Sequence, residues 1–163
     1  MVLKEACTPR QSVFDKSRRD VVLDIVDLLV SKIDAERFFE ENYITSGMKT
    51  LFEKTFARLE NRSDQAGTFV LTQAMGGGKT HNMIALGLLA KHPSLREQVL
   101  GKGRPGTRID SVRVVGFSGR ESDAPLGIWG TIADQLGKRD FFKDYYTPLS
   151  APGQNAWMVV LYM

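Results

Sequence analysis

A glycine-rich stretch between an apolar run and an apolar-rich segment places the strongest constraint on how this chain folds. The apolar run is Phe69–Leu71, and Met83–Ala90 reads as a helix. Between them lies the sequence Gln73-Ala74-Met75-Gly76-Gly77-Gly78-Lys79-Thr80-His81. A strand, a flexible loop, a lysine, a hydroxyl and a helix, in this order, are the context of a P-loop, which binds nucleotide phosphates. We therefore expect a nucleotide site here.

Each residue type in the stretch suits one part of phosphate binding. The three glycines, Gly76, Gly77 and Gly78, have no Cβ, so the backbone can curl its N–H groups around phosphate oxygens. A helix starting near Gly78 adds unpaired N–H groups and the positive end of its dipole. Lys79 supplies a charge for the β- and γ-phosphates, and the Thr80 hydroxyl is placed to bind Mg²⁺. We expect residues 74–81, Ala74 to His81, to bind ATP, with Lys79 and Thr80 in catalytic roles.

One position departs from the usual G-x-x-x-x-G-K-[ST] pattern, because Gln73 stands where the first glycine is expected. The departure affects the shape of the first turn more than the phosphate-binding amides. The alternative is a glycine-rich strand-to-helix turn with an incidental Lys79-Thr80 pair, and the flanking strand and helix patterns weigh against it.

Composition agrees with an ordinary globular protein. The 163 residues are 42% hydrophobic and 25% charged, and 22 basic minus 19 acidic residues give a net charge of +3. Cys7 is the single cysteine, so no internal disulfide forms, and no Cys/His cluster has zinc spacing. No stretch approaches the length of a membrane span and Met1–Arg10 has no signal-peptide core, so we expect a cytoplasmic protein.

Residues 1–63 are expected to form a helical lead-in. Asp34 is a candidate N-cap for a short helix that contains Phe38 and Phe39. Two apolar stripes recur at helical spacing: Val22, Ile25, Val26, Leu29 and Ile33 in the first, and Met48, Leu51, Phe52, Phe56 and Leu59 in the second.

Residues 64–163 are expected to form the nucleotide-binding domain, an α/β fold with a partial parallel sheet and helices on both faces. Val112–Phe117 reads as a second strand. Polar residues of the loop that follows, Ser118, Arg120 and Glu121, are weak candidates for ligand contacts. Asp123 and Pro125 start a further helix with Trp129 as a core anchor, which ends at Gly137.

The segment between the expected P-loop helix and second strand is basic. Its basic residues are Lys91, Arg96, Lys102, Arg104, Arg108 and Arg113, against two acids, Glu97 and Asp110. Such an excess could contact nucleic acid or the phosphates of a neighbouring subunit's nucleotide, but a solvated surface loop is favoured, because no aromatic residues are interleaved for base stacking. Within the segment, Ser94 and Glu97 have capping-box spacing, and Gly101 is a candidate C-cap.

A P-loop ATPase also needs an acid at the end of a neighbouring apolar strand, and none can be assigned. Val112–Phe117 runs into Ser118, and the closing run Trp157–Met163 contains no acid. The chain is therefore expected to be the front part of an ATPase module that binds nucleotide and hydrolyses it slowly or not at all on its own.

The stretch Thr72–His81 resembles the variant P-loop of large prokaryotic AAA+-like ATPases of phage-defence islands, similar to those of phage-growth-limitation and bacteriophage-exclusion systems. The supporting stretches are Arg37–Met48, Ile128–Gly137 and Pro152–Trp157. The resemblance implies ATP and Mg²⁺ binding at Gly76–Thr80 in a longer protein that acts with DNA and DNA-modifying partner proteins, and it allows a homo-oligomer. His81 matches the pattern without an assigned role.

Two other functions remain open. A small-molecule P-loop kinase would use the same cradle, although no lid or phosphate-acceptor site can be assigned. A non-catalytic module could instead bind nucleic acid through the basic segment Lys91–Arg113, and its affinity would then fall steeply with salt.

Overall fold

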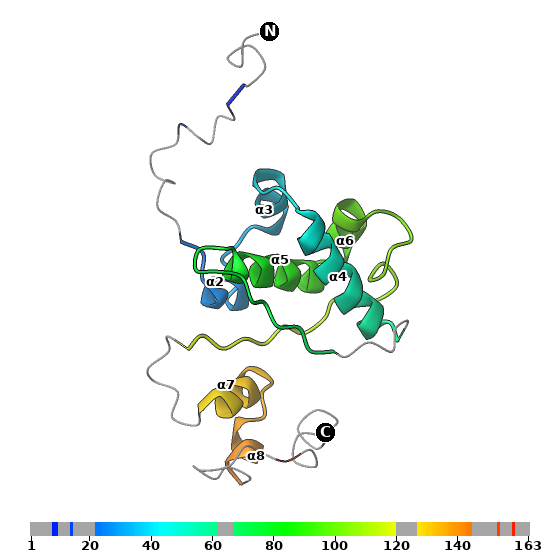
Figure 1. Cartoon of the computed structure of the whole chain (residues 1–163). Helices are drawn as coiled ribbons and strands as arrows, with labels where there is room; N and C mark the ends of the chain where they lie inside the picture. Colours follow the sequence, from blue (N-terminus) through cyan, green and yellow to red (C-terminus); the bar gives the residue numbers. More distant parts are fainter. Residues whose placement is uncertain are drawn as a thin grey trace.

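The computed structural model describes residues 22–61, 67–119 and 127–144, with residues 8, 9, 14, 153 and 158 as isolated positions. Within them the chain is helical (Figure 1). The helices are α2 (Ile25–Leu29), α3 (Ala35–Glu41), α4 (Ser46–Leu59), α5 (Lys79–Lys91), α6 (Pro93–Leu100), α7 (Gly127–Gln135) and α8 (Arg139–Lys143). No helix among the described residues has the length and apolar content that crossing a membrane requires.

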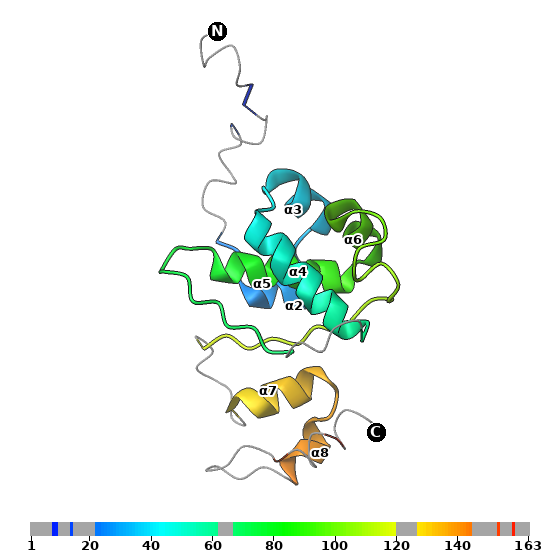
Figure 2. The same ribbon diagram turned by 45° about the vertical axis from the view of Figure 1, so that its right-hand side comes forward.

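Helix α5 is the centre of the larger helical group and is covered on several sides (Figure 2). It contacts α2, α3 and α6. Its buried residues cover all faces of the helix: Asn82, Ile84, Ala85, Gly87, Leu88, Leu89 and Ala90. A helix that is apolar all round is stable in water only when other elements surround it. The composition of Met83–Ala90 therefore explains the central position of α5.

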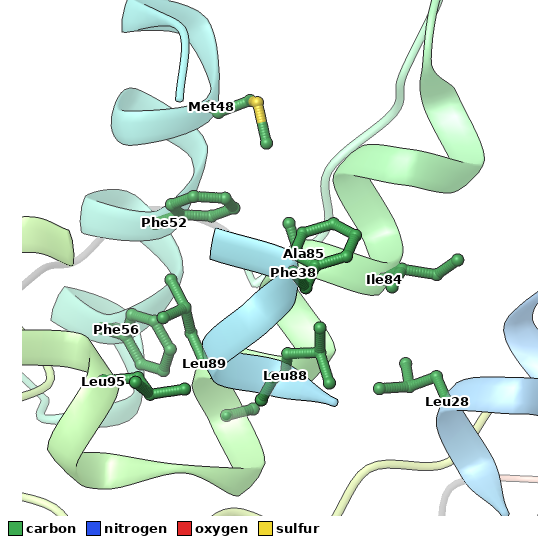
Figure 3. Packing of buried hydrophobic residues seen from close by; sticks show 12 residues of the cluster. Leu28, Phe38, Met48, Phe52, Phe56, Ile84, Ala85, Leu88, Leu89 and Leu95 are labelled. Atoms are coloured by element: carbon green, nitrogen blue, oxygen red, sulfur yellow. The ribbon is translucent and has the colours of Figure 1, made fainter. Parts of the chain in front are cut away.

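Helix α4 supplies the largest side chains of the core, as its apolar stripe predicted. Met48, Phe52 and Phe56 are buried and lie opposite Ala85, Leu88 and Leu89 of α5 (Figure 3). Leu28 of α2, Phe38 of α3 and Leu95 of α6 complete the cluster. Leu59, the last member of the stripe, is 44% exposed, because the core ends before it.

The first helices begin where side-chain caps are available. Asp34 accepts a hydrogen bond from Arg37 N at 3.1 Å, which confirms it as the N-cap of α3. Helix α2 is shorter than its apolar stripe predicted. It starts after the capping residue Asp24 and ends at Leu29, where Ser31 adopts a left-handed φ of 57° and turns the chain. Val22 consequently lies outside the helix and is 83% exposed.

The expected parallel sheet with helices on both faces is wrong for the described residues, which contain no strand. Residues 68–74 and 110–118 are extended, but they do not pair in a ladder. Val112 N donates to Ala90 O at the end of α5, and the Gln135 side chain of α7 bonds Gly116 N at 2.9 Å and Gly116 O at 2.7 Å. Strand propensity makes a sheet only when a neighbouring strand takes these bonds, and at Val112 and Gly116 the partners lie in helices instead.

The second extended segment runs between two helices. Gly116 lies against Ile25 of α2 on one side and is bonded to Gln135 of α7 on the other. Figures 1 and 2 show both extended segments passing between α5 and α7. The Gln135 amide thus occupies the place that a neighbouring strand would take, and it ties α7 to the chain beneath α5.

The ends of α6 and the buried face of α7 agree only in part with the sequence-based expectations. The C-cap Gly101 of α6 is confirmed, with φ of 98° and Gly101 N donating to Glu97 O. The capping box at Ser94 is wrong, because α6 starts with Pro93 and Ser94 lies inside the helix. Trp129 is 38% exposed instead of anchoring a core, since Gly130 and Ala133 form the buried face of α7. The expected helix start at Asp123 and Pro125 falls outside the described residues.

Arg96 of α6 is fully buried and holds the end of α5 to the following segment. Its guanidinium donates to five carbonyl oxygens, those of Leu89, Ala90, Gly106, Ile109 and Asp110, at 2.6 to 3.0 Å. It also lies 5.0 Å above the centre of the Phe56 ring. Desolvation lowers the pKa of Arg96, and the carbonyl dipoles offset the cost of burying its charge.

We predict that Arg96→Leu destabilises the protein by about 3 kcal/mol or more, because buried carbonyl oxygens at two segments lose their donors. Urea unfolding followed by circular dichroism measures the change. Arg139→Ala is the control, since Arg139 is exposed and its ion pair with Asp134, at 3.5 Å, is a surface one, and it should change stability by less than about 0.5 kcal/mol. Equal losses for the two variants would contradict the role assigned to Arg96.

Candidate phosphate-binding loop

The glycine-rich stretch forms an exposed loop that leads directly into α5. Gly76 and Gly78 have φ values of 77° and 82°, in the left-handed region that other residues rarely adopt. Gly78 is the N-cap residue of α5 and supplies no side chain to cap it. The first N–H groups of the helix, from Lys79 to His81, have no acceptor within the helix. The predicted order of loop, lysine and helix start is thus present.

Lys79 turns back across the loop. Its Nζ donates to Gln73 O at 2.7 Å and to Ala74 O at 2.9 Å. The ammonium thus links the first residues of the loop to the helix start that follows the loop. An ammonium has three N–H donors, and these two bonds engage two of them. The positive charge therefore lies at the mouth of the loop, next to the N-terminus of α5.

Gly77 packs tightly against the start of the loop. Its N–H donates to Ala74 O at 3.0 Å. A Cβ at this position would lie 2.9 Å from Gln73 Cβ and 3.0 Å from Ala74 O, too close for a side chain. Gln73, which stands where a glycine was expected, keeps its Cβ because residue 77 has none. The structure thus shows how the first turn closes without a glycine at position 73.

The other predicted site residues are all close to this loop. Ala74 and Met75 are exposed in it, and the Met75 side chain is 100% exposed. Thr80 is exposed in the first turn of α5, as a metal-binding hydroxyl would need to be. The described residues contain no group of three or more His, Cys, Asp or Glu side chains that could hold a metal ion. Thr80 would therefore supply a single oxygen to a cation.

His81 is packed against α3. Its ring stacks on Phe38, with ring centroids 4.8 Å apart and planes inclined by 29°, and Phe38 meets Phe39 edge to face. Burial lowers the pKa of His81 from its ordinary value of 6.5. A neutral imidazole stacked on a phenyl ring is the form that this environment favours. The histidine after the Lys-Thr pair thus joins the loop to the N-terminal helices.

Fewer basic side chains of the segment Lys91–Arg113 are free to bind nucleic acid than its composition suggested. Arg96 is buried, Lys91 donates to Leu28 O and Ser31 Oγ, and Arg104 forms an ion pair with Glu53 at 3.4 Å. Half of the six basic side chains thus bind other parts of the fold. The other three, Lys102, Arg108 and Arg113, are exposed; Lys102 and Arg108 lie in the turns that follow α6, and Arg113 lies in the second extended segment. This arrangement favours the expected surface loop over a continuous nucleic-acid interface.

Sequence reasoning overlooked Asn82, which is 9% exposed and donates from Nδ2 to Gln73 Oε1 at 3.3 Å. Its one sequence signal was a polar residue within an apolar-rich helix. The stacking partner of His81 was also missed, because Phe38 is far from it in sequence.

The polar residues after the second extended segment were weak candidates for ligand contacts. Ser118 is half-buried at the end of that segment, and Arg120 and Glu121 fall outside the described residues.

We predict that the free energy of unfolding falls as the pH decreases through and below 6.5, in part because of His81. With the folded pKa lowered, the unfolded chain binds more protons than the folded chain in this range, and protonation then favours unfolding. His81→Phe, which keeps a stacking ring, should flatten this slope in urea titrations at several pH values. The matched control is His92→Gln, at an exposed histidine. An unchanged slope in His81→Phe would refute the prediction.

Comparison with known proteins places this chain in one family. The DUF499 N-terminal domain matches residues 5–108, a range that includes α2 to α6 and the whole loop. No curated protein and no solved structure matches the chain. Because the match covers more than half of the chain, the protein belongs to the family of DUF499 N-terminal domains.

Proposed function

We propose that residues 74–81 bind the phosphates of ATP·Mg²⁺, and that the chain is the nucleotide-binding part of an AAA+-like ATPase. The single observation that carries the proposal is the position of Lys79. Its ammonium lies across a glycine loop whose exit is the N-terminus of α5, which no side chain caps. A fixed cation beside unpaired helix N–H groups favours a bound anion. Anion binding of this kind depends on the loop, the lysine and the helix start, and these are present in the described residues without a paired sheet.

The roles of the residues follow from their positions. The left-handed glycines Gly76 and Gly78 let the backbone approach an anion, and a Cβ at either position would meet no atom within 4 Å, so there is space around them. Lys79 would exchange one of its carbonyl acceptors for a phosphate oxygen, or use its third N–H. The N–H groups at the start of α5 would bind a second phosphate oxygen.

Magnesium would arrive bound to the nucleotide. Mg²⁺ in such sites keeps several waters and is held by substrate phosphates together with one or two protein oxygens. The exposed hydroxyl of Thr80 fits the role of one protein oxygen. The donor set therefore fits a metal that is mostly coordinated by phosphate and water.

In the longer protein that the sequence resemblance implies, ATP hydrolysis would drive a DNA-associated phage-defence or DNA-modification complex. No acid that could position the attacking water has been assigned in this chain. We therefore propose that the chain binds ATP but does not turn it over efficiently. Sustained ATP turnover that depends on Lys79 would contradict this part of the proposal.

We predict that Lys79→Ala weakens ATP·Mg²⁺ binding by about tenfold or more, because a charge-assisted phosphate contact is lost. Isothermal titration calorimetry on the whole chain measures the affinity. Thr80→Ala should weaken binding when Mg²⁺ is present and have little effect in EDTA. Lys102→Ala, at an exposed lysine, is the control. Equal affinity of the wild type, Lys79→Ala and Lys102→Ala would rule out a phosphate site at this loop.

We also predict that Gly77→Ala weakens ATP·Mg²⁺ binding by about tenfold, because the added methyl must push Gln73 and Ala74 apart and open the loop. Gly119→Ala is a matched control, since a Cβ there would meet no atom within 4 Å and the residue has no positive φ. The same calorimetric titration compares the two. Wild-type affinity in Gly77→Ala would show that the closed loop is not the binding form.

A further inference from the structure

Asn82 is bonded to both ends of the glycine loop. Its backbone N–H donates to Gly78 O, the last loop residue, at 2.8 Å. Its side-chain Nδ2 donates to Oε1 of Gln73, the first loop residue, at 3.3 Å. The first bond is the ordinary i to i−4 bond at the start of the helix, so the link that depends on the asparagine side chain is the one to Gln73.

The two partners of the side-chain bond differ in how firmly they are held. Asn82 is 9% exposed and belongs to α5, the helix at the centre of the core. Gln73 is exposed and belongs to the loop. A buried amide needs a hydrogen-bonding partner, because an unsatisfied one loses the free energy of its hydration. The bond therefore ties an exposed residue of the loop to a buried residue of the central helix.

The position of Gln73 in turn determines the other contacts of the loop. Lys79 Nζ donates to the main-chain carbonyl of Gln73, and Gly77 is packed against its Cβ. A displacement of Gln73 would move the acceptor of the Lys79 ammonium and change the turn that contains the Gly77 amide. The Asn82 side chain thus acts on the lysine and on the glycine backbone through Gln73.

We propose that Asn82 is a positioning residue of the phosphate-binding loop, which keeps Lys79 and the glycine amides in their binding arrangement by holding the Gln73 side chain. This inference rests on the proposed function and deepens it, because it assigns how the site is pre-organised when its first glycine is replaced by glutamine. Pre-organisation raises affinity by removing the cost of ordering the loop on binding.

A double-mutant cycle tests this inference with the whole chain and ATP·Mg²⁺ as the probe. The variants are Asn82→Ala, Gln73→Ala and the double variant, with affinity measured by calorimetry. Each single variant should lower the affinity by about three- to tenfold, the effect of one lost hydrogen bond. The double variant should be no weaker than the weaker single variant, because both remove the same bond. Asn82→Leu, which fills most of the same volume without a donor, should behave like Asn82→Ala.

The control for a general loss of packing is Gln135→Ala, which removes an amide that bonds Gly116 and has no partner in the loop. It should leave the affinity unchanged. Thermal melts establish that each variant is folded at the temperature of the titration. Hydrogen exchange of the Gly77 amide, which bonds Ala74 O, should speed up in Asn82→Ala and Asn82→Leu and stay unchanged in Gln135→Ala.

The outcomes separate this inference from the proposed function. Wild-type binding that Lys79→Ala abolishes, while Asn82→Ala and Asn82→Leu keep full affinity, would overturn the inference alone. Independent, multiplying losses from Gln73→Ala and Asn82→Ala would also overturn it, since the two side chains would then not act as one unit. No ATP binding by a folded wild-type chain would overturn the proposed function, and the inference with it.

Discussion

Burial of helix α5 on all its faces is the condition on which the rest of the structure depends. The helix packs against α2, α3 and α6, and the phenyl rings of α4 cover its second half. From Ile84 to Ala90 such a helix has little solvated surface, because its neighbours pack closely around it. Both of its ends are consequently fixed in space. The glycine loop lies at the first end, and the buried guanidinium of Arg96 lies at the second.

At each end of α5 a basic side chain donates hydrogen bonds to backbone carbonyl oxygens, but the two side chains differ in exposure. At the C-terminal end, Arg96 donates to two carbonyl oxygens of α5, those of Leu89 and Ala90, and to three carbonyl oxygens of residues 106–110, so one side chain joins the end of the helix to that segment. At the N-terminal end, Lys79 binds two carbonyl oxygens across an exposed loop, where its charge stays accessible. A buried cation of this kind stabilises the fold, whereas an accessible cation beside helix N–H groups favours an anion.

Several features of the loop could be predicted because they depend on residues that are adjacent in sequence. Left-handed glycines followed by a helix, with lysine in its first turn, follow from local backbone preferences, and so does the Asp34 cap of α3. The sheet could not be predicted in the same way. Val112–Phe117 has strand composition, but its backbone partners are Ala90 and Gln135, which lie in helices. Whether an extended segment joins a sheet depends on neighbours that its own sequence does not specify.

The sequence by itself determined the helical period of α4, the cap of α3 and the order of loop, lysine and apolar helix, because these follow from side-chain spacing, local geometry and neighbouring residues. The tertiary structure alone decided that Arg96 is buried instead of joining a basic surface, that His81 stacks on Phe38, and that Asn82 holds Gln73. The physical reason is that such pairings join groups through space. Their free energy comes from excluding water around contacts that exist only after the helices have packed.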